Sequence, residues 1–284
     1  MNGNYNILVF TTVVLNIALL VMGYLIGSLN TSIIFSKFLK KDVRSQHSQN
    51  AGATNSSRVF GIKIGVLILL IDVLKTIAAV ALATGIAYWV NAAPQVSSKG
   101  PSSSESFKQY QAIIAVPMLS GIGVVLGHCF PVFFGFKGGK GVASSIGLII
   151  SYNIVLLPIA AIFFFAVAFW KKYISLASMV AAVLLIPFVF VPWMSNSTIA
   201  WATNYQWLEW TKTVNLEEQI APDQRGFIQY VATYVVNYAS IYTGFIYLGA
   251  VALILFTHRG NIQRLLKGEE RKWSRNKNTN NDAQ

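Results

Sequence analysis

GHCFPVFFGFKGGKG, residues 127–141, joins two apolar segments of the chain. Its closely spaced glycines allow backbone conformations closed to other residues, so that successive N–H groups can converge on an anion. Lys137 and Lys140 supply positive charge. The small polar residues after Gly141 predict the start of a helix, whose N-terminus also favours an anion. This glycine loop therefore predicts a phosphate site at a membrane face.

The glycine loop does not meet the pattern of a nucleotide-binding P-loop. Phe134 stands where that pattern requires glycine, and Gly141 stands where it requires Ser or Thr. Nucleotide hydrolysis is thus disfavoured, whereas anion binding remains. His128 is either a phosphate donor or a loop histidine whose hydrogen bonds are satisfied within the protein.

The composition of the 284-residue chain indicates a polytopic membrane protein, because 54% of its residues are hydrophobic and only 11% are charged. Soluble domains carry roughly 25% charged residues. The first apolar segment is too long for a secretory signal and lacks a basic region before it, which predicts a retained span. Cys129 is the one cysteine, so the chain can form no internal disulfide and no thiolate metal site. We expect neither a metal nor a cofactor.

The apolar segments predict an all-α polytopic membrane protein with about seven transmembrane segments. One of them is a short half-helix, since Ser151-Tyr152-Asn153 predicts a tight turn within a run that is too long for one helix. The segments are residues 7–36, 61–90, 111–127, 142–150 (the half-helix), 153–170, 174–193 and 235–256. They form a single domain over residues 1–270, with 194–234 as an extracytoplasmic insertion and 271–284 as a disordered basic tail.

The distribution of positive charge predicts the orientation of these segments. With the N-terminus outside and the C-terminus in the cytoplasm, 17 of the 22 lysines and arginines face the cytoplasm, in accord with the positive-inside rule. They are Lys37, Lys40, Lys41, Arg44, Arg58, Lys63, Lys137, Lys140, Lys171, Lys172 and the seven between Arg259 and Lys277. Because the net charge of +12 follows this topology and forms no extended groove, we expect no nucleic-acid partner.

Two further polar stretches fall on the same predicted face as the glycine loop. The first loop, residues 44–58, is crowded with hydroxyl and amide groups that suit phosphate or polyol oxygens, and Arg58 can hold a phosphate through two parallel bonds. A solvated loop of turns and helix caps is the alternative. In the tail, residues 257–270, His258 and Asn261 share a helical face, and His258 can donate to an anion or shuttle a proton. A cluster of positive charges that marks the cytoplasmic end of a transmembrane segment would explain the Arg and Lys residues of the tail, but not His258 and Asn261.

Asp72 and Lys75 lie inside the apolar segment 61–90. Charges within a membrane are costly and usually paired. Their spacing of three residues allows a mutual salt bridge. We expect this pair to be structural, supporting the first loop, in preference to a catalytic role.

Together, three stretches resemble the acyl-phosphate-dependent glycerol-3-phosphate acyltransferases of bacterial membranes, the PlsY family. Residues 48–58, 127–141 and 258–270 match the family's serine loop, its glycine loop and its H-x-x-N-I-x-R-L-x-x-G-x-E tail. The resemblance implies a seven-span plasma-membrane protein with a cytoplasm-facing active site. It also implies transfer of an acyl chain from acyl phosphate to the 1-hydroxyl of sn-glycerol 3-phosphate. Lysophosphatidic acid and phosphate would be the products, in the first step of phospholipid synthesis.

The same resemblance implies the site residues. The predicted catalytic set is Ser48, Lys140, His258 and Asn261, and the predicted substrate-binding set is Arg58, Asn50, Gly52, Thr54, Asn55, His128, Gly138, Gly139, Gly141 and Glu269. We expect Ser48 to position a substrate and not to act as a nucleophile, because acyl phosphate is already activated and no G-x-S-x-G elbow surrounds this serine. Where the family usually has glycines, this chain has His47 and Gln49, which predicts an altered loop shape beside Ser48.

Other functions remain as alternatives. A membrane transporter of phosphorylated solutes predicts charges midway across several segments, where only Asp72 and Lys75 qualify, and no internal repeat is visible. Within the enzymes, acyl-CoA or acyl-carrier protein is the alternative donor, and a Ser/His acyltransferase would pass through an acyl-serine. The expected partners are acyl phosphate, sn-glycerol 3-phosphate and membrane lipid, for a protein that works as a monomer.

Overall fold

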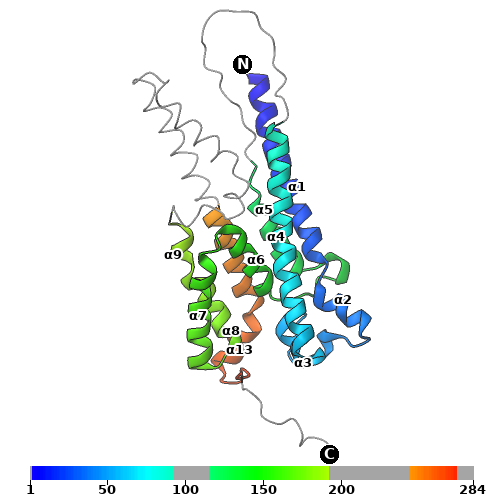
Figure 1. Ribbon diagram of the computed structural model, residues 1–284, viewed down its shortest axis with the longest axis vertical. Coiled ribbons are helices and arrows are strands. Elements are labelled where there is room, and N and C mark those ends of the chain that lie inside the picture. Colours follow the sequence, from blue (N-terminus) through cyan, green and yellow to red (C-terminus); the bar gives the residue numbers. More distant parts are fainter. Residues whose placement is uncertain (1, 93–114, 192–242, 274–284) are drawn as a thin grey trace, which may run out of the picture.

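The computed structural model describes residues 2–92, 115–191 and 243–273, and every regular element within these ranges is helical. The elements before the first gap are α1 (Asn2–Ser28), α2 (Thr31–Phe38), the 3-10 turn η1 (Val43–Ser45), α3 (Ala53–Phe60) and α4 (Ile62–Ala92). Those between the gaps are α5 (Met118–Cys129), the 3-10 turn η2 (Val132–Phe134), α6 (Val142–Tyr152), α7 (Leu156–Lys171), α8 (Ile174–Leu184) and α9 (Ile186–Val189). The last are a helix over Thr243–Thr257 and α13 (Arg259–Leu266). Figure 1 shows α1 to α4 on one side of the molecule, α7 to α9 on the other, and α6 between them.

Two of the described helices are long and apolar enough to cross a membrane. They are Val9–Phe38, which takes in most of α1 and all of α2, and Ile62–Ala87 within α4. The helix Thr243–Thr257, with α13 bent from it by 55°, is a third candidate. They correspond to the predicted segments 7–36, 61–90 and 235–256. Helices α5, α6, α7 and α8 are apolar but shorter, because turns and caps interrupt them.

The predicted half-helix is confirmed by α6, which begins directly after Gly141 and ends at Tyr152. Asn153 ends α6 in an extended conformation, and its side-chain oxygen accepts from the N–H of Val155 at 2.9 Å before α7 begins. The break therefore falls where the Ser-Tyr-Asn sequence predicted it. Lys172, with a left-handed backbone (φ +60°), ends α7.

The first apolar run, predicted as the segment 7–36, is one candidate span but contains a break between α1 and α2 that the sequence did not reveal. Helix α1 ends at Ser28, and Asn30 caps the new helix α2 by accepting from the N–H of Ile33 at 3.2 Å. The polar stretch that follows is also more ordered than the predicted loop, since residues 53–60 form α3. The chain thus turns back on itself before α4 begins.

Helices α1 and α5 approach each other closely at glycines. A Cβ on Gly23 or Gly27 of α1, or on Gly123 or Gly127 of α5, would overlap the backbone of the facing helix. Spacing of four residues places each pair on one helical face, and small residues allow helix backbones to meet in membranes. Because α1 leads to the first loop and α5 to the glycine loop, this contact brings both loops to one end of the molecule.

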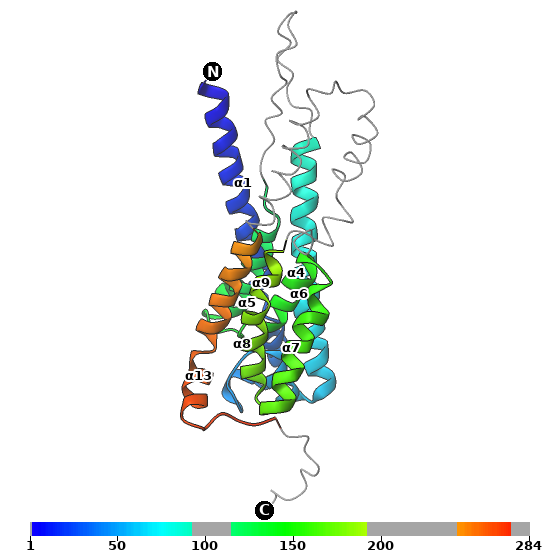
Figure 2. The ribbon, with the colours of Figure 1, turned by 90° about the vertical axis from the view of Figure 1, so that its left-hand side faces the viewer.

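That end lies opposite the N-terminus. Figure 2 shows α13 at the far end of the molecule from the start of α1. The predicted insertion 194–234 and the tail residues 274–284 lie outside the described residues, as does most of the connector before α5.

Candidate active site

A cavity of about 700 Å³ opens where the first loop, the glycine loop and α13 meet. Its mouth is polar, whereas its interior, between α4, α6, α7, α8 and the helix Thr243–Thr257, is lined by aliphatic and aromatic side chains such as Ile149, Leu157 and Phe164. All predicted site residues except Gly138 and Gly139 line it: Ser48, Asn50, Gly52, Thr54, Asn55, Arg58, His128, Lys140, Gly141, His258, Asn261 and Glu269. Three stretches that are far apart in sequence thus share one site. Lys137, by contrast, is exposed and does not line the cavity.

A chain of polar contacts links the glycine loop to the tail. The Nζ of Lys140 donates to Oδ1 of Asn261, and Nδ2 of Asn261 donates to Oε1 of Glu270 at 2.6 Å. Glu270 also accepts from Oγ of Ser175 at 2.6 Å and from Nε of Arg264 at 2.9 Å. The carboxylate therefore fixes the amide that in turn orients the lysine.

Two of these groups have shifted pKa values. Burial lowers the pKa of the Lys140 ammonium to about 8. The positive charge of Arg264 also lowers this pKa, whereas the negative charge of Glu270 acts to raise it. At neutral pH Lys140 is therefore still mainly protonated. For Glu270, burial acts to raise the pKa, but the hydrogen bonds from Ser175, Asn261 and Arg264 outweigh it and the pKa is lowered.

His258 is only 3% exposed, and burial lowers its pKa to about 4, so the ring is neutral at physiological pH. Its Nδ1 lies 2.8 Å from the carbonyl oxygen of Ile254. Because a carbonyl can only accept, Nδ1 carries the proton and Nε2 is the acceptor. His258 is thus suited to accept from a hydroxyl group and not to donate to a phosphate.

At two glycines the glycine loop differs from the predicted phosphate site, in which successive N–H groups converge on an anion. The N–H of Gly138 donates to the carbonyl of Cys129 at 3.2 Å, and that of Gly139 donates to the carbonyl of His128 at 3.0 Å. These amides are therefore used within the protein. Gly139 is needed for another reason, because a Cβ there would overlap the ring of His128 and lie 2.7 Å from the carbonyl of Ala51 in the first loop.

The N-terminus of α6 provides the anion-binding features instead. Gly141 caps this helix with a left-handed backbone (φ +82°) that favours glycine. In the first turn, the hydroxyls of Ser144 and Ser145 are buried and have no hydrogen-bond partner in the part of the chain that the structure describes. Ser145 lines the cavity beside Lys140. A helix N-terminus, a free hydroxyl and an ammonium group together suit a phosphate.

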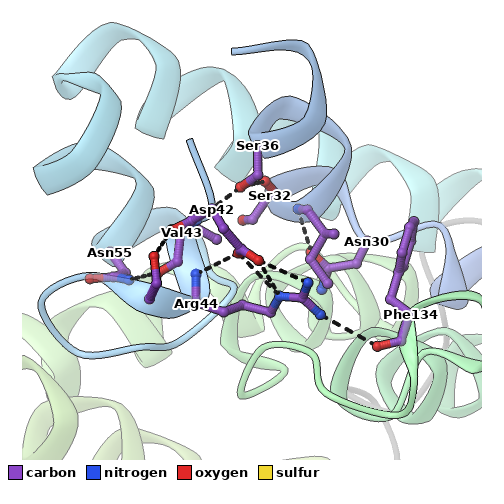
Figure 3. A network of polar contacts seen from close by, with 10 residues as sticks. Asn30, Ser32, Ser36, Asp42, Val43, Arg44, Asn55 and Phe134 are labelled. Carbon is purple, nitrogen blue, oxygen red and sulfur yellow. Dashed lines mark hydrogen bonds and ion pairs between the residues drawn. The ribbon is translucent and has the colours of Figure 1, made fainter. Parts of the chain in front are cut away.

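The first loop is held in place by its own polar network (Figure 3). Asp42 pairs with Arg44 at 2.9 Å, and Nη1 of Arg44 donates to the carbonyl of Phe134 in the glycine loop at 3.4 Å. Asn55 is 1% exposed, and its Nδ2 donates to the carbonyls of Val43 at 2.8 Å and Gln46 at 3.1 Å. Its Oδ1 accepts from the N–H of Ser48 at 3.2 Å. Asn55 therefore holds Ser48 at the mouth of the cavity, which differs from the predicted contact with substrate.

His47 and Gln49, on either side of Ser48, have left-handed backbones with φ of +50° and +55°. Glycine adopts such conformations freely, whereas other residues do so at a cost of about 1–2 kcal/mol each. The backbone beside Ser48 thus takes a conformation that glycine would favour, although neither residue is glycine. Non-glycine residues in this region are frequent at functional sites.

Sequence reasoning missed several residues of the site. Glu270, and not the exposed Glu269, makes the polar contacts of the tail, and the final glutamate of the tail pattern already fell at position 270. Arg264 and Ser175 complete the same network and gave weaker sequence signals. No group of three or more His, Cys, Asp or Glu side chains within residues 2–92, 115–191 and 243–273 is placed to hold a metal ion.

Comparisons with known proteins identify the family of this chain. The family model for glycerol-3-phosphate acyltransferase matches residues 17–268. The chain belongs to the glycerol-3-phosphate acyltransferase family. The resemblance to PlsY is thereby confirmed; the match covers the first two motifs in full and the tail motif as far as residue 268.

Relatives in this family align along nearly the whole chain. The glycerol-3-phosphate acyltransferase of Mycoplasmopsis synoviae (strain 53) is 40% identical over 266 residues, which cover 93% of this chain and 97% of the relative. That of Mycoplasmopsis agalactiae is 38% identical over 265 residues, which cover 93% and 96%. The crystal structure of PlsY (YgiH), an integral membrane glycerol 3-phosphate acyltransferase in its glycerol 3-phosphate form, matches with a TM-score of 0.59 and 28% identity, over 91% of this chain and 96% of that one. The fold is therefore that of an integral membrane acyltransferase.

Proposed function

We propose that this acyltransferase takes its acyl group from acyl phosphate and transfers it to the 1-hydroxyl of sn-glycerol 3-phosphate. The products are lysophosphatidic acid and inorganic phosphate, and the reaction is the first step of phospholipid synthesis. The single observation that carries the proposal is the cavity, which has a polar mouth built from three basic stretches and an apolar interior. Two phosphorylated groups fit the mouth, and an acyl chain fits the interior.

The acyl phosphate is assigned to the N-terminus of α6. Lys140 and the hydroxyl of Ser145 can bind its phosphate, and the ammonium of Lys140 stabilises the charge that develops on the leaving phosphate. Asn50, Gly52 and Thr54 of the first loop line the same mouth. The acyl chain then extends between α6, α7 and α8.

Glycerol 3-phosphate is assigned to the opposite side of the mouth. Arg58, exposed on α3, can take its phosphate through paired hydrogen bonds. Neutral His258 can accept from a glycerol hydroxyl at Nε2, and Asn261 and Ser48 orient the same molecule. When the 1-hydroxyl attacks the acyl carbon, the carbon–oxygen bond to phosphate breaks and the hydroxyl proton passes to a phosphate oxygen. No covalent enzyme intermediate is required.

The membrane arrangement is part of the proposal. About seven transmembrane segments, with the N-terminus outside, put the mouth of the cavity on the cytoplasmic face of the plasma membrane. The positive charge of the first loop, the glycine loop and the tail supports this orientation. We further propose that residues 1–270 act as one domain and that a monomer is sufficient.

The test is a donor-exchange assay with purified protein in lipid bilayers. With palmitoyl phosphate, phosphate release should require glycerol 3-phosphate and should match the lysophosphatidic acid formed. Palmitoyl-CoA and palmitoyl-acyl-carrier protein should give no product under the same conditions. Transfer from either of these, with none from palmitoyl phosphate, would refute the proposed donor. Uptake of glycerol 3-phosphate into vesicles without acyl transfer would refute the enzyme and favour a transporter.

A further inference from the structure

Asp72 lies in the first half of α4 with a fully buried side chain. Its Oδ1 lies 2.8 Å from Nζ of Lys75, which confirms the predicted salt bridge, and also accepts from Oγ1 of Thr31 at 2.8 Å. Nδ1 of His128 is 3.5 Å from the same oxygen. The three neighbours belong to α4, to the start of α2 and to the end of α5. One carboxylate therefore meets three separate parts of the chain.

The first connection runs from Asp72 to the first loop. Thr31 follows Asn30, the residue that caps α2 at the break after α1. Lys75 reaches the carbonyls of Gly27 at 3.4 Å and Leu29 at 3.5 Å, at the same break. The Nδ2 of Asn30 lies 3.4 Å from the carbonyl of Ala51, inside the first loop. Asp72 thus fixes the position from which the first loop departs.

The second connection runs from Asp72 to the glycine loop. The ring of His128 is fixed at Nδ1 between Asp72 and Lys75, whose Nζ is 3.4 Å away. The other side of that ring is so close to Gly139 that a Cβ on this glycine would overlap it. Gly139 directly precedes Lys140. Asn30 joins the two connections, because its Nδ2 also lies 3.2 Å from the carbonyl of His128.

Charge balance alone does not account for this arrangement. Replacing a buried ion pair with neutral residues is often neutral or stabilising, so the pair is not needed for stability as such. Ionisable groups inside membrane spans usually mark functional sites. In addition, Oδ2 of Asp72 is buried without a hydrogen-bond partner among the described residues, and Asp72 lines the cavity together with His128.

We propose that Asp72 is a positioning residue for acyl transfer: through Thr31 and His128 it sets the distance between the first loop and the glycine loop, and so between the two substrates. The inference rests on the proposed function, since it assigns one substrate to each side of the cavity mouth. Each loop keeps its own binding residues when Asp72 is changed. The mutual placement of the substrates is what is lost, and a displacement of about 1 Å can cost roughly a hundredfold in rate.

The test compares Asp72→Asn with the double variant Asp72→Asn/Lys75→Met. The single variant leaves the Lys75 charge unpaired, so its thermal stability in detergent should fall. The double variant removes both charges and should regain the wild-type unfolding temperature. Its kcat should nevertheless remain at least tenfold below wild type, while KM for both substrates stays within threefold. If kcat of the double variant recovers together with its stability, Asp72 serves only to balance the charge of Lys75, and the proposal is overturned.

A milder pair of variants tests the same idea without altering charge. Thr31→Val, at the start of α2, removes one hydrogen bond to Asp72. Thr84→Val makes the same change of side chain on α4, where the hydroxyl donates to the carbonyl of Val80 in the same helix at 2.9 Å. Thr31→Val should lower kcat at least threefold with no loss of thermal stability, whereas Thr84→Val should not change kcat. Equal rates in the two variants, or a rise in KM at unchanged kcat, would refute positioning by Asp72. If the wild-type protein transfers no acyl group from any donor, the proposed function fails instead.

Discussion

Replacing Lys140 with methionine removes the one ammonium group that the glycine loop directs into the cavity, and keeps nearly the same side-chain length. In the same loop, Lys137 is exposed and lies outside the cavity lining, so Lys137→Met is a matched control. Both variants lower the charge of the loop by one. A difference between them therefore reports on the position of the charge and not on the overall field.

The expected loss follows from the position of Lys140 at the edge of the protein interior. Two unit charges about 4 Å apart interact by about 4 kcal/mol at the effective dielectric constant of roughly 20 that suits such sites. Part of this energy already acts on the bound substrate, and only the part that grows in the transition state affects kcat. Removal of one oxyanion-stabilising donor typically costs about 10²–10³-fold in kcat. We expect a loss of that size for Lys140→Met, and less than threefold for Lys137→Met.

The assay is release of phosphate from palmitoyl phosphate at saturating glycerol 3-phosphate, combined with thermal unfolding in detergent. The unfolding temperature of Lys140→Met should not fall, because a partly buried charge has been removed. The reasoning would be refuted if Lys140→Met kept more than a third of the wild-type kcat. It would also be refuted if Lys137→Met lost as much activity as Lys140→Met.

Three further predictions concern the same machinery. Because the pKa of Lys140 is lowered to about 8, its charge is lost as pH rises through that value, so kcat/KM should fall above pH 8. Lys140→Arg stays protonated and should retain activity to higher pH; if kcat/KM of that variant falls at the same pH as in the wild type, the assignment is contradicted. Glu270→Gln should lower kcat/KM at least tenfold, and at least fivefold more than Glu269→Gln, because only Glu270 orients Asn261 and pairs with Arg264. Equal losses of kcat/KM in the two variants would show that this network is not needed for acyl transfer. Gly27→Ala should lower the free energy of unfolding by about 1–3 kcal/mol, since the new methyl group would overlap the backbone of α5. Gly85→Ala, where a Cβ would meet no atom within 4 Å, should be neutral or stabilising, and similar unfolding temperatures for the two variants would disprove the close contact between α1 and α5.

Local signals were sufficient for much of the fold. Hydropathy located the long helices, because a run of about 20 apolar residues has few alternatives in a membrane. The Ser-Tyr-Asn turn and the helix start after Gly141 were also found where the sequence predicted them, since both depend on residues close together in the chain. The break at Asn30 was missed, because a single polar residue within an apolar run gives no clear stop signal until its partners are known.

Side-chain roles within the site depended on contacts that the sequence does not contain. Asn55 was expected at the substrate, but its polar atoms are used by the first loop itself. The amides of Gly138 and Gly139 were expected at an anion, but they bond to the carbonyls of Cys129 and His128. A motif records which residue types are present, whereas the partner that satisfies each polar group is chosen by the packing around it.

The sequence alone thus determined that this chain is helical, apolar and organised around three basic motifs of a glycerol-3-phosphate acyltransferase, because composition, periodicity and motif order are properties of the linear chain. Only the tertiary structure decided that Lys140, Asn261 and Glu270 form one connected network, that His47 and Gln49 take left-handed backbones, and that Asp72 joins two loops. Burial, hydrogen-bond partners and charge proximity arise when distant segments meet, and these control which polar groups remain free for chemistry.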